Sequence, residues 1–357
     1  MAYTTIDDPS IYFHTQLYAG NGNDDRSITN DANAGNFKPD WLWLKNRSGT
    51  NSHALVDSTR GPTKVLRSNA TNAEETEANG IQAFETDGFQ IGSGGLVNTD
   101  GNNYVAWQWI ANGGTTTIND ASSTSVGTID SVYQANTTAG FSIVTYTGTT
   151  SAGTIAHGLG AVPKMIIIKN RDDGAENWAV YHAGIASDAE TDYIYLDSNN
   201  AASDDANLFN DTAPTSTVFS IGTSGVVNQA EAHIAYCFAE KQGYSKLGSY
   251  EANNSTDGTF IYTGFKPAWV ILKCVDSAGN WFLYDKARDS SNMVTQTLYG
   301  DLNAAENTES NGLDFLSNGI KLRQSGSGGI NHSGTYIYMA FAEHPFVSSE
   351  GTLTTAR

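Results

Sequence analysis

The fold of this chain is decided by the stretch Phe37-Lys38-Pro39-Asp40-Trp41-Leu42-Trp43-Leu44-Lys45-Asn46-Arg47, because the chain contains two further versions of it. The second is Ala161-Val162-Pro163-Lys164-Met165-Ile166-Ile167-Ile168-Lys169-Asn170-Arg171, and the third is Phe265-Lys266-Pro267-Ala268-Trp269-Val270-Ile271-Leu272-Lys273-Cys274-Val275. In each version a proline precedes a run of large apolar or β-branched residues that ends in lysine. Proline lacks the N–H that a central strand needs, so it predicts the start of a strand. The continuous apolar run predicts a strand that is covered on both faces.

The segments around this stretch recur as well. A Gly/Asn/Thr-rich hairpin candidate precedes each version, and a short strand and a closing strand pair follow it. The last strands of the second and third versions share the same letters, Phe238-Ala239-Glu240 and Phe341-Ala342-Glu343. A segment that recurs at a fixed place in a longer pattern indicates a repeat architecture. We therefore predict three diverged copies of one antiparallel β module.

The repeats divide the chain into modules of roughly a hundred residues, a size that can bury a core. We expect an N-terminal arm that is either free or docked on a neighbouring subunit, and a polar C-terminal tail. A Gly/Ser/Thr-rich linker predicts that module 1 either moves relative to the others or packs through a distinct interface. Modules 2 and 3 abut and should form a rigid pair. The expected ranges are arm 1–11, module 1 12–112, linker 113–138, module 2 139–242, module 3 243–346 and tail 347–357.

Composition agrees with an all-β protein and limits the partners. Gly at 36 and Tyr at 17, with 16% charged residues, favour turns and half-buried aromatic side chains. The net charge of −19 would repel a phosphate backbone, so we expect no nucleic-acid partner. Residues 1–9 have neither the basic start nor the apolar core of a secretory signal, and no apolar run is long enough to insert into a membrane. We therefore expect synthesis in the cytoplasm.

The two cysteines, Cys237 and Cys274, both lie in predicted strands. The corresponding positions in the other copies do not hold cysteine, so the repeats share no covalent framework. We expect two small buried thiols rather than a disulfide, a nucleophile or a zinc site.

The sequence contains no pattern that indicates an enzyme. It lacks the nucleophile elbow, the zinc-binding helix, the P-loop and the dinucleotide fingerprint. The seven histidines do not align between the copies, so we expect no catalytic residue and no cofactor. Paired carboxylates are frequent, and two carboxylates with different pKa values can cleave glycosides. A glycan-degrading enzyme is therefore kept as an alternative.

Two kinds of binding site remain open. Hard oxygen ligands cluster in two acidic loops, so Ca²⁺ is possible there; the candidate ligands are Asp172, Asp173, Asp204 and Asp205. None of these loops completes a known calcium motif, and solvated acids are the alternative. Trp43 alternates with Trp41 and Trp107 with Trp109, so each pair shares one face of a strand. Trp43 and Trp107 are thus either core residues or a platform that stacks on sugars.

Several of these segments resemble virion structural proteins of marine tailed phages, namely phages that infect cyanobacteria and pelagic bacteria. The resemblance rests on the start Met1-Ala2-Tyr3-Thr4-Thr5-Ile6-Asp7-Asp8-Pro9-Ser10, on the stretch from Phe37 to Arg47, and on His157-Gly158-Leu159-Gly160 with the lysine-terminated run behind it. It covers most of modules 1 and 2, whereas module 3 has lost the Asn-Arg after its lysine. The resemblance implies concanavalin-like or jelly-roll β-sandwich modules, and it carries no catalytic residue.

The leading hypothesis is accordingly a phage virion surface or appendage protein, such as a tail fibre or a capsid knob, released by host lysis. It would contact other virion proteins and a host-surface glycan, and it would form homo-oligomers, since phage appendages are usually symmetric. Capsid decoration without any ligand is the second hypothesis. The glycan depolymerase is the third.

Overall fold

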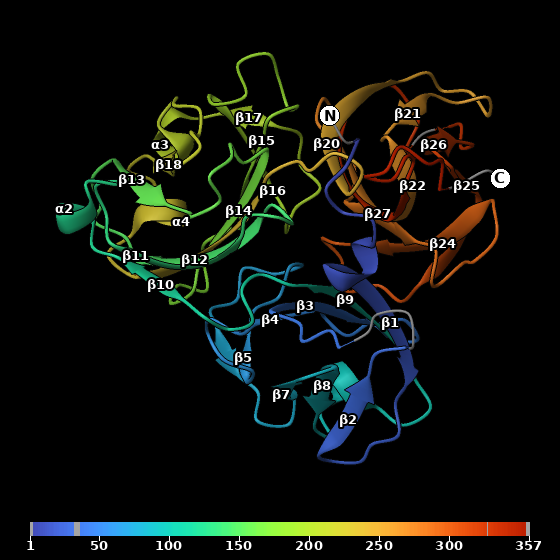
Figure 1. The fold of residues 1–357 in the computed structure, drawn as a ribbon, viewed down its shortest axis with the longest axis horizontal. Helices are drawn as coiled ribbons and strands as arrows, with labels where there is room; N and C mark the ends of the chain where they lie inside the picture. The colour runs from blue at the N-terminus through green and yellow to red at the C-terminus, as the bar shows by residue number, and fades with distance from the viewer. Residues whose placement is uncertain (1–2, 32–35, 327, 355–357) are drawn as a thin grey trace.

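The computed structural model describes residues 3–31, 36–326 and 328–354, and it confirms the all-β fold class. All the paired strands form antiparallel ladders, and the four α-helices in this part of the chain have four residues each. No helix in the described ranges is long and apolar enough to cross a membrane. Figure 1 shows three groups of strands, coloured blue to teal, green to yellow and orange to red, arranged around a common centre.

Module 1 is a sandwich of two sheets. The main sheet has the order β1-β9-β3-β4, the second sheet has the order β2-β8-β7, and side chains of both sheets form one apolar core. A small β5-β6 pair lies beside them. The bounds are β1 (Phe13–Ala19), β2 (Arg26–Thr29), β3 (Trp41–Asn46), β4 (Ala54–Asp57), β5 (Lys64–Val65), β6 (Glu75–Thr76), β7 (Ile81–Glu85), β8 (Gly88–Ile91), α1 (Gly95–Asn98) and β9 (Asn103–Trp109); the short 3-10 helix η1 (Pro9–Ile11) precedes them.

Module 2 has a main sheet of eight strands in the order β10-β11-β12-β19-β14-β15-β16-β17, and a separate β13-β18 pair. The bounds are β10 (Thr117–Asn119), α2 (Ala121–Thr124), β11 (Ser131–Asn136), β12 (Phe141–Thr147), β13 (Gly153–Ala156), β14 (Met165–Asn170), β15 (Ala179–His182), β16 (Asp192–Tyr195), β17 (Ser203–Asp204), α3 (Ala206–Phe209), β18 (Val218–Ile221), α4 (Gly225–Asn228) and β19 (Ala232–Phe238).

Module 3 consists of a single eight-stranded sheet in the order β20-β27-β22-β23-β24-β25-β26-β21. The sheet folds back on itself, because β21 and β26 share an apolar core with β22 and β27. The bounds are β20 (Ser245–Ala252), β21 (Phe260–Tyr262), β22 (Phe265–Cys274), β23 (Phe282–Asp285), β24 (Val294–Tyr299), β25 (Asn307–Leu316), β26 (Gly319–Leu322) and β27 (Gly334–Pro345).

The same strand pairing occurs in all three modules. Each lysine-terminated run forms the strand between the last strand of its module and the short strand that follows the run: β9-β3-β4, β19-β14-β15 and β27-β22-β23. Trp41, Met165 and Trp269 occupy the same place in this pattern. Their partners on the last strand are Trp109, Phe238 and Phe341, and those on the short strand are Asp57, His182 and Asp285. The common origin of the three modules stays a prediction.

The prediction that each proline marks a strand start is correct twice and wrong once. Strands β3 and β14 begin two residues after Pro39 and Pro163. Strand β22 instead runs through Pro267, and its register with β27 shifts on both sides of this residue. A β-bulge leaves one residue out of the ladder, so it can accommodate a proline that has no N–H to donate.

One face of each main sheet points to a core that all three modules share. Trp41 of module 1 stacks on Tyr236 of module 2 with ring centroids 4.4 Å apart, and Trp109 of module 1 meets Trp269 of module 3 edge to face at 5.6 Å. Phe13 stacks on Phe341 at 5.1 Å. Since the opposite face of each main sheet contacts its own module, all six residues of β3 and of β14 are buried. The predicted coverage on both faces is confirmed.

Buried rings of each module also donate hydrogen bonds to the backbone of a neighbouring module. Trp178 Nε1 donates to Arg67 O at 2.9 Å, and Trp281 Nε1 donates to Tyr195 O at 2.9 Å. In module 1 a histidine takes this role. Trp43 Nε1 donates to His53 Nδ1 at 2.8 Å, so the ring proton lies on His53 Nε2, which is 2.9 Å from Tyr299 O. Burial lowers the pKa of His53 to about 3, so the ring is neutral and this tautomer is maintained.

Two of the three junctions contain equivalent buried ion-pair networks. At the junction of modules 1 and 2, Asp57 and Glu74 hold Arg60, and Arg171 of module 2 donates to Glu74 at 2.8 Å. At the junction of modules 3 and 1 the same roles fall to Asp285, Glu306, Arg288 and Arg47. At the third junction His182 stands in the aspartate position and hydrogen-bonds Tyr338 O at 3.1 Å.

The lysine at the end of each run is buried. Lys45 Nζ donates to Asn46 O and Gly49 O, Lys169 Nζ to Asn170 O and Asp173 O, and Lys273 Nζ to Cys274 O and Asn200 O, at 2.6–3.1 Å. Lys45 and Lys169 therefore fasten the loop beyond their own strand, whereas Lys273 fastens a loop of module 2. Burial lowers the pKa of all three lysines from 10.5 to about 8.

The expectation of a flexible linker is wrong. Residues 113–138 contain β10, α2 and β11, and β11 pairs with β12 along its whole length. Gln134 on β11 also donates to Ser58 Oγ at 2.7 Å and Thr59 Oγ1 at 2.6 Å, which connects module 2 to module 1. Asp120 caps α2 by accepting from Ser123 N, and Thr124 Oγ1 donates to Asn119 Oδ1 at 2.8 Å, so this stretch is ordered by its polar side chains. Of the two expectations for module 1, the packed interface is the one observed.

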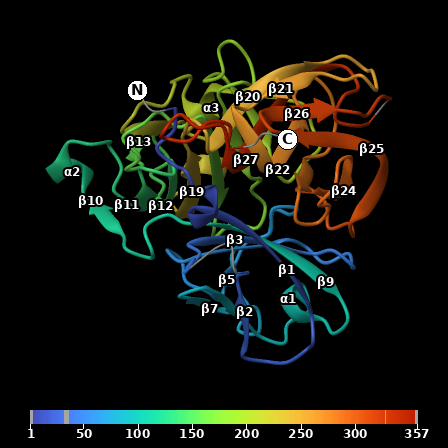
Figure 2. The same ribbon diagram turned by 45° about the vertical axis from the view of Figure 1, so that its right-hand side comes forward.

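The N-terminal arm is neither free nor placed for another subunit; it lies on module 3 of its own chain. Tyr3 Oη donates to Gly264 O at 2.8 Å, Thr4 Oγ1 donates to Gln242 O at 2.8 Å, and Ile6 is buried in the shared core. In the described part of the tail, Ser349 N donates to Asp7 at 2.6 Å. Figure 2 shows the blue arm crossing beside the orange strands of module 3.

The low pKa values of the buried lysines predict an unusual pH dependence of stability. The unfolded chain keeps these protons up to about pH 10.5, whereas the folded chain releases them near pH 8. Between these values the unfolded state binds more protons, so the lysines make the free energy of unfolding rise with pH. We expect the free energy of unfolding of the wild type, minus that of Lys169→Met, to rise with pH by up to about 1.4 kcal/mol per pH unit in this window. Urea denaturation at several pH values measures both free energies. Lys45→Met and Lys273→Met provide replicates, and a flat difference would contradict the assignment.

Removing the buried aspartate of a junction network should be strongly destabilising. Asp285→Ala removes the fully buried one of the two carboxylates that hold Arg288 and leaves Trp107 Nε1 without its acceptor, and we expect a loss of about 3–5 kcal/mol in the free energy of unfolding. The matched control is Asp314→Ala, whose partner Arg323 is partly exposed, with an expected loss of about 1 kcal/mol or less. Chemical denaturation of both variants gives the comparison. Equal losses of stability in the two variants would show that the buried junction network contributes no more than a partly exposed ion pair.

Candidate functional site

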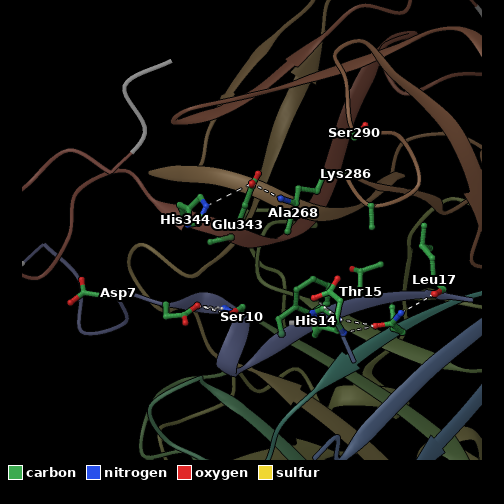
Figure 3. Close-up of a pocket in the computed structure, with 16 residues that line it drawn as sticks. Asp7, Ser10, His14, Thr15, Leu17, Ala268, Lys286, Ser290, Glu343 and His344 are labelled. Carbon is green, nitrogen blue, oxygen red and sulfur yellow. Dashed lines mark hydrogen bonds and ion pairs between the residues drawn. The ribbon is translucent and has the colours of Figure 1, made fainter. Parts of the chain in front are cut away.

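A cleft of about 860 Å³ lies at the junction of modules 1 and 3 (Figure 3). The arm and β1 form one wall, with Asp7, Asp8, Ser10 and residues 13–17. The opposite wall consists of Ala268 on β22, the end of β27, and the loop that follows β23. The volume falls in the range of small-molecule and peptide pockets, and junctions between modules are a common place for them.

The wall formed by module 3 carries a compact charge cluster. Glu343 on β27 forms ion pairs with Lys286 and with Lys266, the latter at 3.0 Å, and its carboxylate lies 3.7 Å from His344 Nε2. Burial by itself would raise the pKa of Glu343, but the hydrogen bonds and charges of the two lysines outweigh it and lower the pKa. Glu343 is therefore an ionised acceptor at neutral pH and not a proton donor.

The wall formed by module 1 is polar and largely neutral at its base. His14 Nε2 lies 3.4 Å from Gln16 Oε1 and 3.9 Å from a carboxylate oxygen of Asp31. Burial lowers the pKa of His14 in spite of the nearby Asp31, so the ring is uncharged at neutral pH. Thr15 Oγ1 is buried and has no hydrogen-bond partner among the described residues.

Carboxylates gather on the arm side of the cleft. Asp8 caps η1 by accepting from Ser10 N at 3.0 Å, and Asp7 accepts from Ser349. Hydrogen bonds from Ser349 lower the pKa of Asp7. The cleft thus combines an acidic margin with an edge strand, a geometry for holding a polar, extended ligand by hydrogen bonds and charge.

The tryptophans considered as a sugar platform lie elsewhere. Trp43 and Trp107 are 0% exposed, and Trp107 Nε1 donates to Asp285 Oδ2 at 3.0 Å. A sugar outside the molecule has no access to either ring, so the core alternative holds for both residues. The two cysteines are free and buried, as expected, and burial raises the pKa of the Cys237 thiol.

Three of the four calcium candidates accept hydrogen bonds from nearby backbone N–H groups, and the fourth lies on a strand. Asp172 Oδ2 accepts from Ala232 N at 2.9 Å, Asp173 Oδ1 accepts from Ala175 N at 2.7 Å, and Asp205 Oδ1 caps α3. Asp204 lies on β17 opposite Asp192. In residues 3–31, 36–326 and 328–354, no group of three or more His, Cys, Asp or Glu side chains is placed to hold a metal ion.

Sequence reasoning missed the cleft. It contains Glu343, which belongs to the shared Phe-Ala-Glu triplet, but that triplet only suggested strand equivalence. The other lining residues come from the arm, β1 and a loop of module 3, and no spacing along the chain connects them. The one available signal was the triplet glutamate on a strand of otherwise apolar residues.

Comparison with known families gives one match. A family model described as a domain of unknown function (DUF7483) matches residues 8–345, from η1 to the last residue of β27. No curated protein matches the chain. The match spans all three modules and both walls of the cleft, so the unit that the family shares is the whole assembly and not a single sandwich. The chain belongs to the family of the domain of unknown function DUF7483.

Proposed function

We propose that this protein is a structural component of a bacteriophage particle, exposed on the virion surface in a tail fibre, capsid knob or similar appendage. The observation that carries the proposal is the shared aromatic core, which joins three sandwiches into one body with buried ion pairs at two junctions. Such a body suits a rigid building block. The resemblance of its opening and of its lysine-terminated runs to virion proteins of marine tailed phages supplies the link to a particle.

The charge and the surface support this role. A net charge of −19 favours solubility and opposes self-association through random contacts. In this proposal the protein is made in the host cytoplasm, assembles with other capsid or tail proteins and with copies of itself, and leaves by lysis.

Contact with a host glycan is the adsorption part of the proposal. Exposed aromatic side chains that could stack on sugar rings lie on β21, where Phe260 is 43% and Tyr262 is 53% exposed. They share one face of the strand, since Ile261 between them is buried. Tyr262 pairs with Gly319 on β26, which has no side chain to cover the ring.

The position of the protein on intact particles tests the proposal. We expect an antibody against the purified chain to label phage particles in electron micrographs, at the tail or over the capsid shell. Label at the tail tip favours adsorption, and uniform label over the shell favours decoration. Particles without label, under conditions in which an antibody to the major capsid protein binds, would refute the virion role.

The exposed aromatic pair gives a separate test of glycan binding. On an array of host-surface polysaccharides we expect the wild type to bind, and the double variant Phe260→Ala/Tyr262→Ala to bind at least tenfold more weakly. Ile118→Ala is the control, because Ile118 is 78% exposed and lies on β10 in module 2. Equal binding by all three proteins would remove β21 as the glycan site.

A further inference from the structure

In each module one strand pairs on its inner side with the last strand of that module, and the three junctions differ in what covers the outer edge of this strand. The strands β1, β12 and β20 are equivalent, because each pairs with the last strand of its module. In module 2 the outer edge of β12 is occupied by β11, which pairs with it from Ser131 to Asn136. There Gln134 stands opposite Ile143 and reaches across to Ser58 and Thr59 of module 1. The chain thus fills this junction with a strand of its own.

A second junction is narrowed by direct contact. Gly184 follows β15 at the place where Thr59 follows β4, and it lies against the backbone of β20. A Cβ on Gly184 would be 3.1 Å from the carbonyl carbon of Gly248 and 3.2 Å from Ser249 N. Backbone therefore meets backbone there, in the region that a strand equivalent to β11 would enter.

The third junction is open, and it is the cleft. Lys286 and Ala287, which follow β23, are the equivalents of Ser58 and Thr59, and they line the cleft opposite β1. In register terms Thr15 of β1 corresponds to Ile143 of β12, because their partners Trp107 and Tyr236 are equivalent. The 860 Å³ space therefore lies where β11 lies at the first junction.

The backbone of β1 is oriented to accept a strand. Ile110 N donates to Tyr12 O at 3.1 Å, and Gly20 N donates to Asn102 O at 2.7 Å, so the even-numbered residues of β1 face β9. The N–H and C=O groups of Thr15 and Leu17 consequently point to the free edge. Two odd-numbered carbonyls confirm this direction, since Leu17 O accepts from Gln16 Nε2 and Ala19 O accepts from Arg26.

We propose that this cleft is a strand-acceptor site, in which an extended segment of a partner protein pairs with β1 as β11 pairs with β12. Main-chain hydrogen bonds to the N–H and C=O of Thr15 and to the N–H of Leu17 would give the affinity, and side chains on alternate residues would give the specificity. An unpaired edge strand is otherwise a liability that proteins cover or interrupt.

Charge selects the kind of partner. Four carboxylates line the cleft (Asp7, Asp8, Asp31 and Glu343) against one lysine, Lys286. Glu343 is neutralised by Lys266 and Lys286, which leaves the margin on the side of the arm and β1 acidic. An acidic segment, such as most segments of a second copy of this chain with its net charge of −19, would meet like charge at this margin. The occupant is therefore an extended segment of a different protein that carries lysine or arginine. This inference depends on the junction geometry and not on the virion role.

A peptide derived from β11 tests the site in the full-length chain. The probe is a fluorescein-labelled peptide of residues 129–137 in which Asp130 is replaced by Lys and two lysines are added at the C-terminus. We expect saturable binding by fluorescence anisotropy, and slower hydrogen exchange at the amides of Thr15 and Leu17. Two N-methylated versions of the peptide identify backbone pairing. Methylation of the alternate residues that face β1 should weaken binding at least tenfold, and methylation of the other set should not.

Two variants of the chain complete the test. Thr15→Pro removes the outward N–H without removing a bond to β9, and it should weaken binding at least tenfold while circular dichroism and the melting temperature show that the fold persists. Thr15→Val keeps the N–H and should bind as the wild type does. The proposal is overturned if the unmodified peptide does not bind at millimolar concentration, if Thr15→Pro binds normally, or if both methylated peptides bind equally.

Discussion

The shared aromatic core is the constraint on which the rest of the structure depends. Each main sheet has one face toward its own module and the other toward this core, so a module taken alone would expose a row of large rings. In module 1 these are Trp41, Trp43, Trp107 and Trp109, all fully buried in the chain. An aromatic side chain of this size buries roughly 150–250 Å². The three modules are therefore parts of one body, because each main sheet is apolar on both faces and only the other modules cover the second face.

Polar groups next to such a core need partners, and several of them find one in a neighbouring module or loop, although Trp41 Nε1, Trp109 Nε1 and Trp269 Nε1 have none among the described residues. His53 and Trp178 donate to backbone carbonyls across a junction, and Arg60 is held by Asp57 and Glu74. Lys45 and Lys169 perform the same task within their modules, and Lys273 performs it across the junction with module 2, where it donates to Asn200 O. Because an unpaired buried polar group costs more than a hydrogen bond contributes, these contacts act mainly by fixing how the modules meet. These contacts determine the relative orientation of the modules more than they add to the stability of the fold.

Local patterns predicted the elements, and long-range geometry decided the site. The lysine-terminated runs, the strands beside them and the all-β class could be read from proline position and apolar periodicity. Pro267 lies inside a strand and not at its start, and the local sequence does not indicate this because a bulge leaves no mark in it. Residues 113–138 have the composition of a linker although they form β10 and β11, because Gly, Ser and Thr are frequent both in coils and in short capped strands. The cleft could not be predicted from the sequence, because Thr15 and Lys286 come to line one cavity only when the modules pack together.

The three equivalent positions are informative where they differ. Strand β11 exists because the connection between modules 1 and 2 is long enough to return along β12, whereas modules 2 and 3 are joined almost directly. The described segment before β1 is the short arm, which is fastened through Tyr3 to Gly264 O and through Thr4 to Gln242 O. The arm thereby forms one margin of the cleft without covering the edge of β1 at Thr15. Modules joined by connections of different length thus leave one strand edge open, and this edge borders a cavity lined by the charged side chains of Asp7, Asp8, Asp31, Lys286 and Glu343.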